Sequence, residues 1–258
     1  MKKILSLLMA AVMLVGCVAM FSSCGKKDEF VIGITYFEPM NYFDDNNELV
    51  GFETEFATAV CEKLGLTPKF QEIDWKAKET ELNSGAIDCI WNGMTITDER
   101  KENMGISNPY MENKQVLVVN SEDLAKYSDA ANLADAYIVA EEGSAGETVA
   151  TENSYFADSK FTAVGTQANA LMEVKSGTAD GALVDYVASI GMIGEGTDYE
   201  NLVVVEAFDF NPEEYGIAFR KDDTETIAKF QKAIDELMAD GTIETIAKKY
   251  KLQDLLVK

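Results

Sequence analysis

The chain has 258 residues, of which 47% are hydrophobic, and a formal net charge of −23 from 22 basic and 45 acidic side chains. This composition fits a packed globular protein of one large domain or two small ones. Nucleic acids and acidic membrane surfaces bind clustered lysine or arginine, and the strong negative charge argues against both partners. The chain contains no histidine, so hydrolase triads and zinc sites that depend on histidine are not expected. We expect no cofactor and no metal.

Residues 1–23 have the pattern of a secretory signal. A positive start, "MKK", precedes apolar residues 4–21, and the composition becomes polar at "SSCGKKDE". Two lipobox-like motifs end in cysteine, "LVGC" at Cys17 and "FSSC" at Cys24. Cleavage at Cys17 would leave the apolar segment "VAMF" at the new N-terminus, so Cys24 is the predicted lipidation site and Cys17 the alternative. Residues 24–29 would then tether the folded part to the membrane through the lipid.

Strand and helix signals alternate along the rest of the chain. The first series predicts, in chain order, a strand at 30–35, a helix at 52–64, a strand at 69–73, a helix at 77–85, a strand at 86–91, a helix capped by Thr97 or Asp98, and a strand at 115–120. The second predicts a strand at 136–140, a helix at 143–153, a strand at 160–165, a helix at 166–177 and a strand at 179–185. The last predicts a strand at 215–219 and helices at 222–241 and 242–250.

A short internal repeat suggests two similar halves. The pattern Glu-x-x-Ser-Gly-x-x-Asp begins at Glu81 and again at Glu173. Both copies mark a helix end, a turn and a strand, which predicts two α/β lobes rather than one long sheet. No proline-rich or serine-rich linker separates the halves, so we expect strands to join them. Cys61 and Cys89 lie in helical and apolar patterns, which predicts buried free thiols.

One turn has the character of an anion site. In parallel α/β lobes, small ligands bind at the turns after strands, where backbone N–H groups and helix N-termini meet. The turn "IWNGMTIT" contains Gly93 and Thr95 and precedes Arg100, one of only two arginines among the 22 basic residues. A guanidinium binds a carboxylate through two parallel hydrogen bonds, which lysine cannot do. The alternative is a surface ion pair of Arg100 with Glu99, Glu102 or another acid.

Three further positions have two interpretations each. Asp185 ends an apolar strand and either binds an ammonium group or caps the following helix. The turn "EEGSAG" around Ser144 either donates N–H groups to an anion or simply needs glycine, and we favour the second interpretation. Trp75 stands between Asp74 and Lys76, away from any apolar run, and is expected to line a site rather than the core.

Together these segments resemble the family 3 bacterial extracellular solute-binding proteins, which serve ABC importers of polar amino acids. The matching pieces include "GITYFEPM", "ELVGFETEF", "LNSGAIDCIWNGMTITDERKE", "ISNPY", "EEGSAGE", "SGTADGALVD" and "EYGIAF". They occur in the family's order and cover essentially the whole chain after the signal. The resemblance implies an α/β periplasmic-binding-protein fold of type II, with two βα lobes joined by two hinge strands. Lobe 1 would comprise residues 30–119 and 210–258, and lobe 2 residues 120–209.

The resemblance also implies roles for residues around a free amino acid. The expected ligand-binding residues are Phe37 (alternatively Tyr36) and Trp75 as aromatic walls, Asn92, Gly93, Thr95 and Ser144 as donors, Arg100 for the carboxylate and Asp185 for the ammonium group. Ala145 and Gly146 depart from the polar residues of many members. Glu38, Glu53 and Glu141 either favour a cationic ligand or are merely solvated, and we prefer the second interpretation. The expected ligand is therefore a polar amino acid of unresolved class.

The predicted function follows from this resemblance. The protein would be a monomer, lipid-anchored at the outer face of the bacterial cell membrane, that captures a free polar amino acid and delivers it to the permease subunits of an ABC importer. It would bind no nucleic acid and would not be an enzyme. The alternatives are an amino-acid sensor and, less favoured, a dehydratase of cyclic carboxylates on the same fold.

Overall fold

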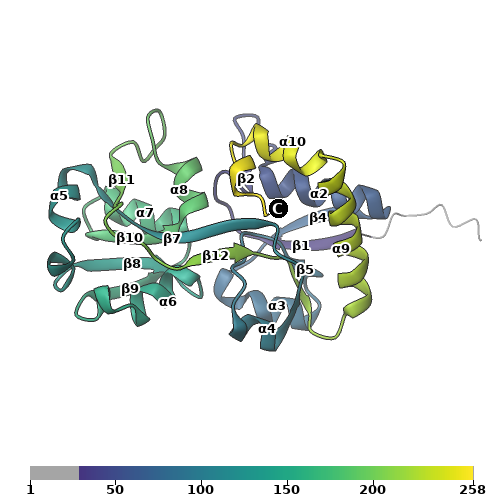
Figure 1. Ribbon diagram of the computed structural model, residues 1–258, viewed down its shortest axis with the longest axis horizontal. Helices are drawn as coiled ribbons and strands as arrows, with labels where there is room; N and C mark the ends of the chain where they lie inside the picture. The colour runs from purple at the N-terminus through teal and green to yellow at the C-terminus, as the bar shows by residue number, and fades with distance from the viewer. Residues whose placement is uncertain (1–28, 258) are drawn as a thin grey trace, which may run out of the picture.

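The structure is a computed structural model that describes residues 29–257. The predicted signal segment and both candidate lipidation cysteines, Cys17 and Cys24, lie outside the described residues. Two α/β lobes stand side by side, each built around its own five-stranded sheet path (Figure 1). Within residues 29–257, no helix combines the length and the apolar character needed to cross a membrane.

The first lobe is an α/β layer structure around a sheet of order β4-β1-β5-β13-β6. Its strands are β1 (Glu29–Ile34), β4 (Thr67–Glu72), β5 (Cys89–Ile90), β6 (Met104–Ile106) and β13 (Ala218–Arg220). Its helices are α2 (Phe52–Leu64), α3 (Lys78–Ser84), α4 (Asp98–Asn103), α9 (Thr224–Ala239) and α10 (Thr242–Lys249), with the small hairpin β2 (Tyr42–Phe43) and β3 (Leu49–Val50). One buried cluster joins the sheet to α2, α9 and α10, and another joins its opposite face to α3.

The second lobe repeats this plan around a sheet of order β11-β7-β10-β8-β9. Its strands are β7 (Met111–Asn120), β8 (Tyr137–Glu141), β9 (Lys160–Val164), β10 (Gly181–Asp185) and β11 (Leu202–Val204). Its helices are α5 (Leu124–Tyr127), α6 (Ala145–Glu152), α7 (Gln167–Lys175) and α8 (Tyr186–Met192). Separate apolar clusters cover the α6 face and the α7 face of the sheet.

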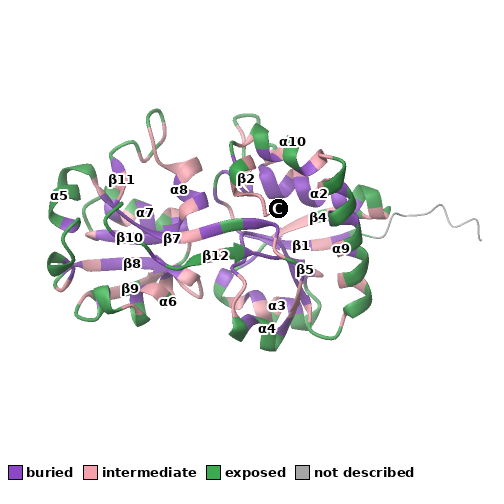
Figure 2. Cartoon of the chain, in the orientation of Figure 1, coloured by how far each residue is buried: buried purple, intermediate pink, exposed green. Residues whose placement is uncertain are grey.

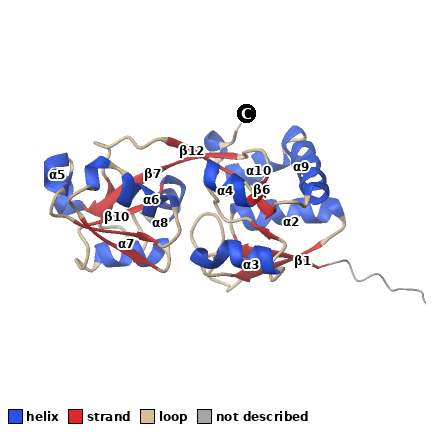
Figure 3. Ribbon diagram, turned by 90° about the horizontal axis from the view of Figure 1, so that it is seen from below, coloured by secondary structure: helices blue, strands red, loops and turns tan. Residues whose placement is uncertain are grey.

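The prediction that strands join the two lobes is confirmed. Strand β7 pairs with β12 (Pro212–Tyr215) over Met111–Lys114, and then pairs with β10 from Gln115 onwards. Strand β7 therefore begins in the two-stranded connection between the lobes and ends in the second sheet. Figure 3 shows β7 and β12 running between the lobes as neighbouring strands. A pair of strands bends more easily than a packed core, so this connection is the natural hinge.

The internal repeat corresponds to two equivalent structural joints. Asp88 Oδ2 accepts a hydrogen bond from the backbone N–H of Val31 at the start of β1, at 2.9 Å. Asp180 Oδ2 accepts one from the backbone N–H of Tyr137 at the start of β8, at 2.8 Å. In both lobes the carboxylate ties the turn after a helix to the first residues of the neighbouring parallel strand, which explains why the same residues recur at the same spacing.

One predicted strand is wrong as a single element. The sequence predicts one strand at 215–219, but β12 ends at Tyr215 and β13 begins at Ala218. Between them the backbone N–H of Gly216 donates to Met94 O (3.0 Å), and that of Ile217 donates to Ser107 Oγ (2.9 Å). These bonds turn the chain away from β7 and into the first sheet. The short strands β6 and β11, of three residues each, have too few residues to show an alternating pattern and were not predicted.

The cores lie where the helix and strand patterns placed them. Figure 2 shows the buried residues along the strands and on the inner faces of the helices. Phe230, Ala233, Ile234 and Leu237 form the buried face of α9, which lies within the helix predicted at 222–241. Cys61 and Cys89 are buried free thiols in the part of the chain that the structure describes.

Candidate functional site

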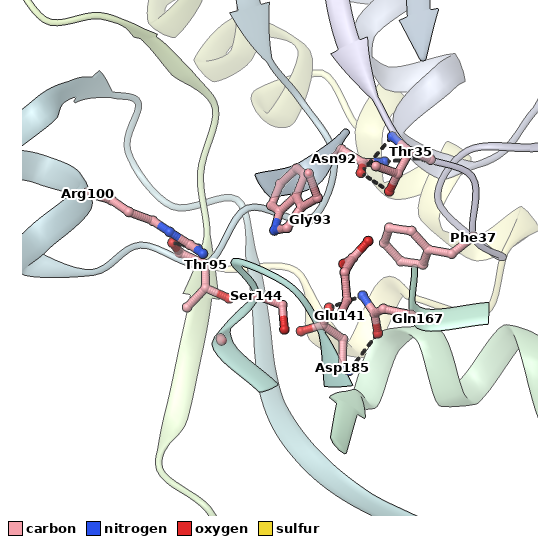
Figure 4. A pocket seen from close by; sticks show the side chains of 12 residues that line it. Thr35, Phe37, Asn92, Gly93, Thr95, Arg100, Glu141, Ser144, Gln167 and Asp185 are labelled. Atoms are coloured by element: carbon pink, nitrogen blue, oxygen red, sulfur yellow. Dashed lines mark hydrogen bonds between the residues drawn. The ribbon is translucent and has the colours of Figure 1, made fainter. Parts of the chain in front are cut away.

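A pocket between the two lobes collects all eight residues that the sequence predicts as ligand-binding (Figure 4). The lining residues are Thr35, Phe37, Trp75, Asn92, Gly93, Thr95 and Arg100 from the first lobe, and Glu141, Ser144, Ala145, Gln167 and Asp185 from the second. They lie at the carboxyl ends of parallel strands in both sheets, which is where ligands bind in α/β folds. The sequence did not single out Thr35 or Gln167.

Arg100 is an interior residue rather than a surface one. It lies in the first turn of α4, where its backbone N–H donates to the capping hydroxyl of Thr97 at 3.1 Å. Only 8% of its surface is exposed. Its Nη1 donates to Thr95 O (2.7 Å), and its Nη2 crosses to Gly143 O of the other lobe (3.1 Å). Since a guanidinium has five N–H donors, these bonds leave three for a ligand.

Arg100 has no carboxylate partner among residues 29–257, so the predicted alternative of a surface ion pair is wrong for the described part of the chain. The other arginine, Arg220, is paired instead: its Nη2 lies 3.2 Å from Asp88 Oδ1, and its Nη1 donates to Ile87 O at 2.8 Å. One arginine therefore stabilises the first lobe, while the other carries a positive charge at the pocket and has no salt-bridge partner among the described residues.

Asp185 lines the pocket from the second lobe, opposite the first-lobe wall that contains Arg100. It is the last residue of β10 and occupies the N-cap position of α8, but its side chain makes no capping hydrogen bond, so the predicted capping role of its carboxylate is wrong. Its Oδ1 accepts from Asn113 Nδ2 and Gln115 Nε2, both at 2.7 Å, and its Oδ2 accepts from Gln167 Nε2. Burial raises the pKa of Asp185, while these three amide hydrogen bonds oppose the shift and favour the charged form.

Hinge and pocket share one polar network. Glu213 on β12 accepts from Thr95 Oγ1 (3.1 Å), from Asn113 (3.2 Å) and from Gln115 (3.0 Å) on β7. The same two amides of β7 hold Asp185. A change in the pairing of β7 with β12 would therefore shift hydrogen-bond partners of Thr95 on one wall of the pocket and of Asp185 on the other.

The turn after β5 uses its donors within the protein. Gly93 N donates to both carboxylate oxygens of Glu53, at 2.8 and 3.0 Å. Asn92 exchanges side-chain and backbone hydrogen bonds with Thr35, and the hydroxyl of Thr95 donates to Glu213. The turn shapes the wall of the pocket, and the donor role of these three residues toward a ligand stays a prediction.

The preferred interpretation that Glu53 and Glu141 are solvated is wrong, because both are buried, at 0% and 3% exposure, and Glu53 is a structural residue of the first lobe. It is fully buried in α2 and also accepts hydrogen bonds from Asn41 Nδ2 (3.1 Å) and from the hydroxyl of Tyr110. Burial raises its pKa to about 7, against the effect of these donors. Because its oxygens are occupied and it lines no part of the pocket, it does not face a ligand there. Glu38 is exposed and lies outside the pocket too.

The aromatic walls are Phe37 and Trp75, each 4% exposed; Trp75 lines the pocket as expected, but the expectation that it stands apart from the core is wrong, because it also packs in a buried cluster of the first lobe. Phe37, not Tyr36, lines the pocket, whereas Tyr36 packs on Phe43 with ring centroids 5.0 Å apart. The Nζ of Lys78 lies 4.9 Å from the Trp75 ring centroid and donates to Gly143 O across the lobes at 3.0 Å. Burial lowers the pKa of Lys78 to about 8, and the charge of Arg100 acts in the same direction.

Ser144 begins α6 as its N-cap, where its hydroxyl oxygen accepts from Glu147 N at 3.1 Å. Close packing explains why the nearby residue 146 is a glycine. A Cβ there would lie 2.7 Å from Leu183 O on β10, so no residue with a side chain fits without moving α6 off the sheet. The departure from the polar residues of many family members thus allows close approach of a helix to a strand.

Comparison with known proteins agrees with this geometry. Residues 30–253 match the bacterial extracellular solute-binding proteins, family 3. The arginine-binding extracellular protein ArtP of Bacillus subtilis (strain 168) is 30% identical over 257 residues, which cover 97% of this chain and 98% of the relative. The crystal structure of Tv2483 bound to L-arginine matches with a TM-score of 0.82 at 28% identity, over 90% of this chain and 93% of that chain.

A further solved structure points the same way. The substrate-binding protein of an ABC uptake transporter from Streptococcus pneumoniae, with bound histidine, has a TM-score of 0.79 at 31% identity, over 89% of this chain and 95% of that chain. With the two sheets and their connecting strands, these likenesses confirm the predicted type II periplasmic-binding-protein fold.

Proposed function

Because the chain belongs to the bacterial extracellular solute-binding proteins of family 3, we propose that it captures a free polar amino acid between its lobes and delivers it to an ABC importer. The observation that carries this proposal is a pair of buried charges of opposite sign on opposing walls of one pocket, Arg100 on the first lobe and Asp185 on the second. A zwitterion offers a carboxylate to the one and an ammonium group to the other. The relatives named above bind arginine and histidine, both free amino acids.

Binding and closure are coupled in this proposal. The charged and aromatic walls of the pocket are at most 8% exposed, so a ligand can enter only if the lobes separate at β7 and β12. Arg100 and Asp185 come from different lobes, and both can contact one ligand only in the closed arrangement. The ligand therefore stabilises the closed state by differential contacts, and the importer's permease subunits would recognise that shape.

We further propose that the protein acts as a monomer and is held at the outer face of the cell membrane by a lipid on Cys24, with Cys17 as the alternative. Mass spectrometry of the protein from a membrane fraction distinguishes the two cysteines. A lipid on neither cysteine would contradict the anchor and leave amino-acid capture untouched.

A thermal-shift screen tests the function. Ligand-free protein, prepared by unfolding and refolding, is heated with each of the twenty amino acids and with ornithine, citrulline and cystine. A ligand that binds only the folded state adds about 4 kcal/mol to the unfolding free energy at a thousand times its Kd, so one or a few members should raise the Tm clearly. No shift with any member would contradict amino-acid capture. Recovery of the ligand unchanged separates binding from the dehydratase alternative.

Closure itself has a specific test at Gly191 in α8. A Cβ at this position would lie 2.5 Å from Glu38 C and 2.6 Å from Pro39 N, both backbone atoms of the other lobe. Gly191→Ala should therefore oppose closure without disturbing either lobe, and weaken binding by about 5- to 150-fold, equivalent to about 1–3 kcal/mol of overpacking. Calorimetry measures the affinity, and scattering measures compaction on ligand addition.

Gly165→Ala is the control for this variant. It lies in the same lobe, and a Cβ there would meet no atom closer than 3.4 Å, so its affinity should match that of the unmodified protein. Equal affinity of Gly191→Ala and Gly165→Ala would show that the lobes do not approach as closely as described when ligand is bound.

A further inference from the structure

The carboxylate of Glu141 is the one acidic group on the pocket wall that the zwitterion does not use. Glu141 is the last residue of β8, is 3% exposed, and lines the pocket. Figure 4 shows its carboxylate reaching into the space between Phe37 and the side chains of Gln167 and Asp185. Its Oε1 has no hydrogen-bond partner among residues 29–257. A buried acceptor without a partner is strongly unfavourable unless a ligand supplies a donor.

The nearby cations do not supply that donor. The Nζ of Lys78 donates hydrogen bonds to the backbone oxygens of Trp75 and Gly143, at 3.2 and 3.0 Å. The guanidinium of Arg100 donates to Thr95 O and Gly143 O. Neither forms an ion pair with Glu141 within the part of the chain that the structure describes.

The electrostatics of the pocket wall favour a positive group beside Glu141. Burial and the charge of Asp185 raise the pKa of Glu141 to about 8, and Lys78 and Arg100 act in the opposite direction without pairing with it. A ligand with a neutral side chain leaves this carboxyl without a counter-charge. A cationic side chain next to it favours its charged form. The aromatic rings of Phe37 and Trp75 line the same space, and their faces also attract a cation.

Resting on the function proposed above, we propose that Glu141 is the specificity-determining residue and that the ligand is a cationic amino acid. The ammonium or guanidinium group of its side chain donates to the unpartnered Glu141 oxygen. The α-carboxylate and α-ammonium groups remain on Arg100 and Asp185. Of the three acids considered from the sequence, Glu53 is hydrogen-bonded elsewhere and Glu38 is exposed outside the pocket, which leaves Glu141 alone in position.

Matched ligands test this inference without any variant. Citrulline has nearly the shape of arginine but carries a neutral urea group in place of the guanidinium. Calorimetry at neutral pH should show that the best of arginine, lysine and ornithine binds on the order of 10- to 100-fold tighter than citrulline, as expected of a charge-assisted hydrogen bond. Equal affinity for citrulline, or tightest binding of a neutral or acidic amino acid, overturns the inference while leaving amino-acid capture standing. Binding of no amino acid contradicts the proposed function itself.

The variant Glu141→Gln tests whether this residue is what distinguishes a cationic ligand from citrulline. The substitution keeps the size of the side chain and removes its charge. The ratio of the affinity for the cationic amino acid to the affinity for citrulline should therefore fall toward one, mainly through weaker binding of the cationic ligand. Glu142→Gln is the matched control: the next residue carries the same group, but it is paired with Lys76 outside the pocket, and its ratio should match that of the unmodified protein. An unchanged ratio in folded Glu141→Gln, checked by the Tm without ligand, overturns the role of Glu141.

Discussion

Replacing Arg100 by alanine is expected to weaken binding of the amino acid by roughly 3–5 kcal/mol, because the ligand carboxylate is then enclosed without its counter-charge. The variant also loses the bond from Arg100 to Gly143 O that joins the lobes in the closed state. Arg100→Lys should recover only part of the affinity, since lysine keeps the charge but lacks the planar pair of donors. Calorimetry with the amino acid found in the thermal-shift screen gives each value.

Two controls make this prediction specific to the carboxylate. The α-carboxamide of the same amino acid should bind weakly to the unmodified protein, and Arg100→Ala should weaken it by much less than it weakens the amino acid, because only the bond to Gly143 O remains to be lost. Arg220→Ala removes the other arginine, which pairs with Asp88 in the first lobe, so it should lower the Tm and leave affinity unchanged. Near-normal affinity of Arg100→Ala would show that the carboxylate binds elsewhere.

Asp185→Asn is expected to weaken binding by about 2–5 kcal/mol, the range for truncating one partner of a buried, hydrogen-bonded charge pair. In the unmodified protein three amide donors hold the carboxylate. Since a carboxylate has about four acceptor positions, there is room for one more donor, the α-ammonium group of the ligand. The variant keeps the size of the side chain and loses the charge that attracts this group.

The matching ligand change is removal of the α-amino group. The deaminated analogue should bind the unmodified protein weakly and should lose little more on Asp185→Asn. Asp180→Asn serves as the control variant, because Asp180 precedes the same strand but bonds to Tyr137 and Tyr127 outside the pocket. If Asp185→Asn and Asp180→Asn reduced affinity equally, the assigned ammonium contact would be wrong.

Local patterns in the sequence predicted much of this fold. Helix α2 spans Phe52–Leu64 and ends at Gly65 in the left-handed conformation, with φ 74°, as the four-residue apolar spacing and the glycine predict. The repeated Glu-x-x-Ser-Gly-x-x-Asp pattern correctly predicted two similar lobes. It is informative because the aspartate of each copy accepts a hydrogen bond from the backbone of a neighbouring strand. The sequence did not predict strands β6 and β11 or the break between β12 and β13. These features depend on hydrogen bonds to residues far along the chain, and local periodicity does not reveal them.

The site divides in the same way. Turn chemistry and the family resemblance placed all eight candidate residues at one pocket. What the sequence did not show is how their polar groups are used. Gly93 donates to Glu53, 40 residues earlier, and Thr95 donates to Glu213, 118 residues later. Glu53 and Glu141 look alike in sequence, yet one is satisfied by three neighbours and the other has an oxygen with none.

A crystal structure of the protein grown with the amino acid that raises its Tm most tests the central claim directly. We expect closed lobes and one ligand in the described pocket, with its α-carboxylate on the guanidinium of Arg100 and its α-ammonium group on Asp185. A ligand bound outside this pocket, or held with its carboxylate away from Arg100, would show that the proposed mode of binding is wrong.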